Sequence, residues 1–150
     1  MRIARFIAAG FGTGYAPVAA GTVASVAAVG VGAVLLWLSP IALAGAALLA
    51  IFGGFVAVRR ADVAGDPGWV VVDEFAGQWI AMLALARPGI PGLLGAFLLF
   101  RVLDISKPGP VGWADRQHGA FGIMADDVIA GGIAALVLGT IRIFWPDLLL

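Results

Sequence analysis

Acidic side chains stand beside apolar stretches at three separate places in this 150-residue sequence. Asp73 and Glu74 lie near the start of one stretch, Asp104 lies at the end of another, and Asp126 and Asp127 precede the last. Carboxylates in apolar surroundings are costly, and clustered ones repel one another unless they are protonated or bound to a cation. The chain has no cysteine and only one histidine, so oxygen ligands favour a hard ion, Mg²⁺ before Ca²⁺ or Mn²⁺, over zinc.

The acids therefore predict a Mg²⁺ site if the fold brings them together. We expect its ligands to come from Asp73, Glu74, Asp104, Asp126 and Asp127, and catalytic groups from Asp73, Glu74, Asp104 and Asp127. The sequence does not separate a metal ligand from a general base, and a carboxylate could also be the nucleophile. Taken singly, each acid could equally cap a helix or lie in interfacial water.

A glycine-rich segment near the N-terminus offers backbone amides to an anion. Residues 10–14 read Gly-Phe-Gly-Thr-Gly, and an apolar stretch begins soon after them. Amides, hydroxyls and a helix N-terminus could together hold a phosphate. No lysine follows the last glycine, so this is not a Walker loop, and alone the segment favours a flexible entry into a helix. The predicted phosphate-binding residues here are Gly12, Thr13, Gly14, Thr22 and Ser25.

Three basic side chains on the same side as the acids are candidates for phosphate binding, Arg101, Lys107 and Arg116, and we select the first two. Arg101 precedes Asp104 by three residues, so on a helix it could pair with that acid or contact phosphate. Lys107 opens a Pro- and Gly-rich stretch, where a lysine is more often an interfacial anchor unless a substrate reaches it. We expect both to contribute to the phosphate site.

The composition is that of a membrane protein. Hydrophobic residues make up 62% of the chain and charged residues 12%, against roughly 45 to 50% and about 25% in soluble domains. Nine basic and nine acidic residues cannot cover the surface of a water-soluble enzyme of this size. The net charge of zero provides no field for nucleic acid. We expect one membrane-embedded domain over residues 1–150.

The apolar stretches predict an all-α bundle of about five hydrophobic helices. Positions 6–58 carry no charge, and Ser39-Pro40 divides this run into two spans. The predicted spans are Val18–Leu38, Ile41–Val58, Trp69–Ala86, Ile90–Leu103 and a last one from near Asp126 to Trp145. With the N-terminus in the cytoplasm, seven basic residues fall inside and two outside. Eight of the nine acids fall on the same inner side, which predicts an active site at the cytoplasmic helix ends.

These motifs, taken together, resemble the phosphatidylglycerophosphatase A family over nearly the whole chain. The matching blocks are Gly10-Phe11-Gly12-Thr13-Gly14 with Pro17, Gly21-Thr22 with Ser25, Asp73-Glu74-Phe75 with Gly77 and Trp79, Phe100-Arg101 with Asp104 and Lys107-Pro108, and Gly122-Ile123-Met124 with Asp126-Asp127 and Ala130-Gly131. The resemblance implies a Mg²⁺-dependent phosphatase that converts phosphatidylglycerophosphate, a membrane lipid, to phosphatidylglycerol. It also implies a multi-pass protein of the bacterial inner membrane.

Other classes of membrane protein share parts of this pattern. An ion or proton-coupled transporter also carries membrane carboxylates, but its sites usually lie near the midplane between repeats, and no repeat is visible. A CDP-alcohol phosphatidyltransferase uses acids and Mg²⁺, but its D-G-A-R-G-D-D motif is missing. A noncatalytic subunit would leave the acids unexplained.

Overall fold

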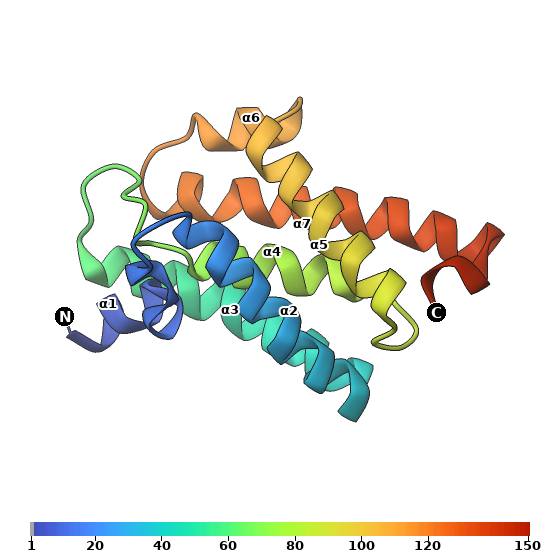
Figure 1. Ribbon diagram of the computed structural model, residues 1–150. Helices are drawn as coiled ribbons and strands as arrows, with labels where there is room; N and C mark the ends of the chain where they lie inside the picture. The colour runs from blue at the N-terminus through green and yellow to red at the C-terminus, as the bar shows by residue number, and fades with distance from the viewer. Residues whose placement is uncertain (1) are drawn as a thin grey trace.

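The computed structural model describes residues 2–150, and they form helices joined by short connections (Figure 1). In chain order the elements are α1 (Arg2–Ala8), the 3₁₀ helix η1 (Gly10–Tyr15), α2 (Ala20–Leu38), α3 (Pro40–Ala61), α4 (Val72–Met82), α5 (Ile90–Ser106), α6 (Pro110–Asp115), α7 (Gly119–Phe144) and the 3₁₀ helix η2 (Pro146–Leu149). The described residues contain no strand, which confirms the all-α class.

Three helices, α2, α3 and α7, are long and apolar enough to cross a membrane. Helices α4 and α5 occupy the places predicted for two further spans, but they have only 11 and 17 residues. A bilayer core takes about 20 helical residues. The prediction of about five spans is therefore confirmed for three helices only.

The break between the first two spans lies where the sequence placed it. Helix α2 ends at Leu38, and α3 begins at Pro40, whose fixed φ suits the first helical position. The hydroxyl of Ser39 accepts a hydrogen bond from the amide of Ile41 at 3.1 Å. Local chemistry alone therefore stops one helix and starts the next.

The start predicted for the last span was wrong. Helix α7 begins at Gly119, seven residues before Asp126. The stretch between them is mostly apolar and continues the helix in the N-terminal direction, so Asp126 and Asp127 lie about two turns inside α7. Neither acid caps the N-terminus of this helix. The Pro- and Gly-rich stretch that follows Lys107 also holds the short helix α6.

Helix α4 is the centre of the bundle and contacts α2, α3, α5 and α7 (Figure 1). Its crossing with α7 is close because glycines face each other. A methyl group at Gly131 would overlap the carbonyl oxygen of Gly77, and one at Gly77 would lie 2.5 Å from the carbonyl oxygen of Asp127. This crossing sets the backbones that carry Asp73, Glu74 and Asp127 beside one another.

The two ends of the bundle carry different segments (Figure 1). The N-terminal helix α1, the connection over residues 62–71 and helix α6 gather at one end. The α2–α3 turn, the connection over residues 83–89 and the C-terminus lie at the other. This separation agrees with alternate connections lying on opposite sides of a membrane.

We expect Gly131→Ala to lower the free energy of unfolding by about 1 to 3 kcal/mol, the usual cost of overpacking a core. The adjacent Gly132 is the matched control, because a methyl group there has no neighbour within 4 Å. Gly132→Ala should raise stability by up to about 1 kcal/mol, because alanine favours a helix interior over glycine. Thermal unfolding of both variants in one detergent measures the difference, and equal losses would contradict the close crossing.

Candidate active site

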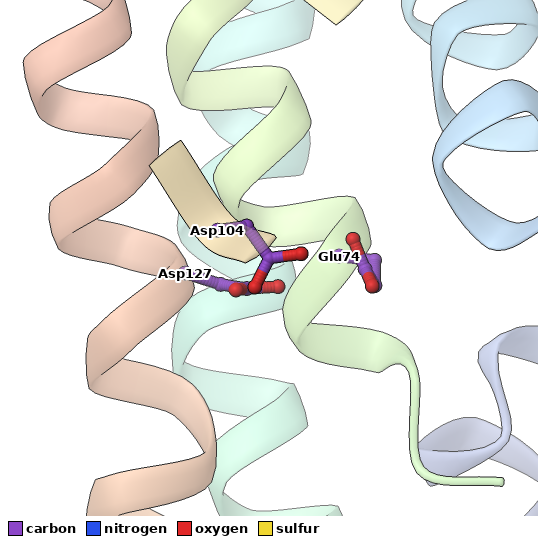
Figure 2. A group of neighbouring side chains, drawn as sticks. All are labelled: Glu74, Asp104 and Asp127. Carbon is purple, nitrogen blue, oxygen red and sulfur yellow. The ribbon is translucent and has the colours of Figure 1, made fainter. Parts of the chain in front are cut away.

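Three carboxylates from three helices meet in the bundle. Glu74 comes from α4, Asp104 from α5 and Asp127 from α7, and each offers an oxygen within 4.8 Å of the others. All three residues are buried, with 8%, 8% and 2% of their surface exposed. Figure 2 shows the three side chains reaching the same level of the bundle. We call this group the acid trio.

Arg101 joins two members of the trio. One guanidinium nitrogen, Nη1, donates to both oxygens of Glu74 at 2.7 Å and to Oδ2 of Asp104 at 2.5 Å. The other, Nη2, lies 3.4 Å from the hydroxyl of Thr22 on α2. Between the two roles considered for Arg101, the structure shows the ion pair, and it extends that pair to Glu74.

Helix α2 holds Glu74 from the other side. The hydroxyl of Ser25, fully buried, donates to Oε2 of Glu74 at 2.7 Å. Gly21 allows this approach, because a methyl group there would overlap Oε1 of the same carboxylate. Of the α2 residues predicted to bind phosphate, Thr22 and Ser25 therefore reach the site, but the hydroxyl of Ser25 already donates its hydrogen bond to Glu74.

Lys107 pairs with Asp104 of the trio and with two acids outside it. It follows α5 in the left-handed conformation, with φ of 50°. Its ammonium lies 3.2 Å from Oδ1 of Asp104 and 3.3 Å from Oδ1 of Asp115, and it donates to Oδ2 of Asp126. Burial alone would lower the pKa of Lys107, but the carboxylates of Asp126 and Asp104 outweigh this and raise it. Lys107 therefore stays charged at any physiological pH.

Two acids have incomplete pairing. Oδ1 of Asp73 is buried without a hydrogen-bond partner among residues 2–150, and no ion pair or hydrogen bond within that range reaches the carboxylate of Asp127. Asp126 is better satisfied, because its Oδ1 also accepts from the amide of Asp127 at 2.9 Å.

This charge balance fits a bound cation. Asp73, Glu74, Asp104, Asp126 and Asp127 carry five formal negative charges, and Arg101 and Lys107 supply two positive ones. The donors are all carboxylate oxygens, the ligand type of a hard divalent ion. The trio is the best placed to hold such an ion. Oδ1 of Asp73 is a further buried carboxylate oxygen without a hydrogen-bond partner among residues 2–150.

The glycine segment has other neighbours. A methyl group at Gly14 would overlap the carbonyl oxygen of Trp69, and one at Gly10 would lie 2.8 Å from the ring of Phe75. The hydroxyl of Thr13 donates to the carbonyl of Gly10 at 2.9 Å. These contacts pack the segment on the start of α4, and the phosphate-binding roles of Gly12, Thr13 and Gly14 stay predictions.

The structure adds two polar residues that sequence reasoning did not select. Gln78 is fully buried, and neither atom of its amide has a partner among residues 2–150. It follows Glu74 by one helical turn inside an apolar segment, a spacing that could have marked it. Asp66 is exposed in the connection before α4, and partial loss of water around its carboxylate raises its pKa against the opposing charge of Lys107.

Comparison with known proteins gives one consistent result. A family model described as phosphatidylglycerophosphatase A matches residues 6–142. The protein of that name from Escherichia coli is 38% identical over 144 residues, covering 93% of this chain and 84% of its own. Its counterpart in Haemophilus influenzae is 37% identical over 144 residues, covering 93% and 88%.

A third relative, from Bacteroides thetaiotaomicron, is 33% identical over 150 residues and covers 91% of each chain. It is named, provisionally, as a phosphatidylinositol-3-phosphatase. No solved structure gives a significant match to the chain.

Proposed function

Because the chain belongs to the phosphatidylglycerophosphatase A family, we propose that it removes the terminal phosphate from phosphatidylglycerophosphate and releases phosphatidylglycerol. The observation that carries the proposal is the acid trio with Arg101 beside it: buried oxygen ligands for a cation, and a fixed positive charge for a phosphate. The relatives' names indicate a phosphatase acting on a lipid.

The proposed cofactor is Mg²⁺, held by Glu74, Asp104 and Asp127 with Asp73 and Asp126 beside them. When bound, such an ion supplies positive charge that neutralises phosphate oxygens and lowers the pKa of a bound water. Hard oxygen ligands are the reason for preferring it to zinc. The same donor set could accept Mn²⁺ with small adjustments.

Other residues of the chain are proposed to bind the phosphate and to accept a proton. Arg101 and Lys107 lie next to the acids. We propose that they donate hydrogen bonds to the phosphate group and so stabilise the negative charge on its oxygens during phosphoryl transfer. The carboxylate of Asp127 makes no hydrogen bond within residues 2–150, so its oxygen that does not face the ion is proposed to accept a proton from an attacking water. Thr22 and the segment Gly12-Thr13-Gly14 are proposed to hold further phosphate oxygens.

The proposed location is the inner membrane of a bacterium, with several spans and the acid trio facing the cytoplasm. The positive-inside bias, seven basic residues against two, supports this orientation. The acid-bearing connections also gather at one end of the bundle.

Purified protein should release inorganic phosphate from phosphatidylglycerophosphate in detergent, and EDTA should abolish the release. Added Mg²⁺ should restore it, whereas Zn²⁺ should not, because the site lacks the ligands that favour zinc. Phosphatidylinositol 3-phosphate serves as the competing substrate and should react more slowly. Full activity in metal-free buffer would contradict the cation site, and faster release from phosphatidylinositol 3-phosphate would contradict the substrate.

Asp104→Asn and Asp127→Asn should each lower kcat at least about a hundredfold, since asparagine keeps the shape but loses the charge needed for ion binding or proton transfer. Asp147→Asn is the matched control, because Asp147 is exposed in η2 at the other end of the chain. Thermal unfolding verifies that the variants are folded. Wild-type turnover in both site variants would assign the acids to a purely structural role.

Cysteine labelling tests the orientation, and the chain has no cysteine of its own. Ala64 and Ala86 are both exposed and lie in connections at opposite ends of the bundle. In intact bacterial cells, an impermeant thiol reagent should modify Ala86→Cys and spare Ala64→Cys until the membrane is opened. The reverse pattern would place the acid trio outside the cytoplasm.

A further inference from the structure

An apolar groove runs along α3 on the side where α1 and α4 pack against it, and Phe11 of η1 lines it as well. One cavity of about 330 Å³ is lined by Ile7, Phe11, Leu49, Val72, Phe75 and Trp79 among others. A second, of about 670 Å³, continues past Phe52 and Val56 to Arg60. The cavities share Ile7 and Gly53, so they form one groove. Arg60 gives it a single cationic end.

The dimensions of the groove suit a lipid chain. Its wall on α3 extends from Ala46 to Arg60, and fourteen helical steps of 1.5 Å cover about 21 Å. One leaflet contributes about 15 Å of hydrocarbon. Helix α3 is also one of the candidate membrane spans, so the groove opens where acyl chains are the surrounding solvent.

A row of aromatic rings forms the wall opposite α3. Phe11 meets Phe75 edge to face with ring centres 6.4 Å apart, and Phe75 meets Trp79 at 5.5 Å. Phe11 holds its place in the row with φ of 57°, a conformation that disfavours bulky residues. The strain is compatible with a wall that must stay in place when a ligand enters.

The polar end of the groove complements an anionic headgroup. Arg60 is exposed and makes no ion pair with any of residues 2–150. A basic side chain at the edge of a membrane span attracts anionic lipids. One charged residue followed by an apolar channel matches a lipid, which has a charged headgroup and a hydrocarbon chain, better than it matches the surface of a protein.

We propose that this groove binds one acyl chain of the lipid substrate, with the headgroup at the end of the groove that carries Arg60. Helix α4 lies between the groove and the acidic site: Val72 and Phe75 line the groove, and Glu74 points to another side of the helix, where it meets Ser25 and Arg101. The proposal rests on the proposed function, because it assigns the groove to the substrate of that reaction.

Two glycines of α3 provide a matched test. Gly53 and Gly45 are both exposed, and an added methyl group has nothing within 4 Å at either position. Only Gly53 lines the groove. A leucine at Gly53 should therefore fill the channel, whereas a leucine at Gly45 should meet lipid only.

The first measurement is the hydrolysis of phosphatidylglycerophosphate with long chains and with six-carbon chains. Gly53→Leu should raise KM for the long-chain lipid about tenfold, leave its kcat unchanged and leave KM for the short-chain lipid unchanged. Gly45→Leu should match the wild type on both. An unchanged KM in Gly53→Leu, or an equal rise for both lipids, would overturn the groove assignment.

The second measurement detects binding without turnover. A phosphatidylglycerophosphate with a diazirine at the end of one chain should crosslink to residues 46–60 in the wild type and in Gly45→Leu, and not in Gly53→Leu. Crosslinks spread evenly over the lipid-facing helices would overturn the proposal. If the wild type hydrolyses no lipid, the proposed function fails, and the crosslinks still decide whether the groove takes the chain.

Discussion

Five carboxylates lie near only two cations at one end of an apolar bundle, and the cations pair with three of the five, Glu74, Asp104 and Asp126. The polar contacts of the fold are arranged around that imbalance. Arg101 serves Glu74 and Asp104, and Lys107 serves Asp104 and Asp126. Unpaired charge away from water is expensive, so each cation is used more than once. The imbalance that remains gives a divalent ion a physical reason to bind, and an anionic substrate would enter more easily once such an ion is present.

The close crossing of α4 and α7 is what turns separate acids into a site. Asp73 and Glu74 are adjacent in the chain and so point about 100° apart on a helix. Their directions depend on the rotation of α4, which is fixed by contact with Gly131 and by the indole of Trp79 donating to the carbonyl of Ala28 at 2.8 Å. Small residues let membrane helices approach closely, and here they bring α7 toward Glu74 without a bulky side chain between them.

The sequence was informative where local chemistry decides the structure. Ser39-Pro40 marked a helix boundary, and acids placed on one side of the membrane indicated a shared site. The start of α7 was less accessible, because paired acids resemble the first turn of a helix, whereas here they lie inside one. The packing of the N-terminal residues on the start of α4 was also hidden, since the amide of Val71 donates to the carbonyl of Ala8, the last residue of α1, through a pairing that spans 63 positions. No local pattern encodes such a pairing.

Helix α4 carries two kinds of face in only 11 residues. Val72, Phe75 and Trp79 follow a spacing of three and four and turn toward the apolar groove. Glu74 and Gln78, one turn apart, occupy another side, which meets Ser25 and Arg101 at the level of Glu74. Residues 72–79 cover seven helical steps of 1.5 Å, about 10 Å in all. One short rigid element therefore turns aromatic side chains to the groove on one face and Glu74 to Arg101 on another, at nearly the same depth in the bundle.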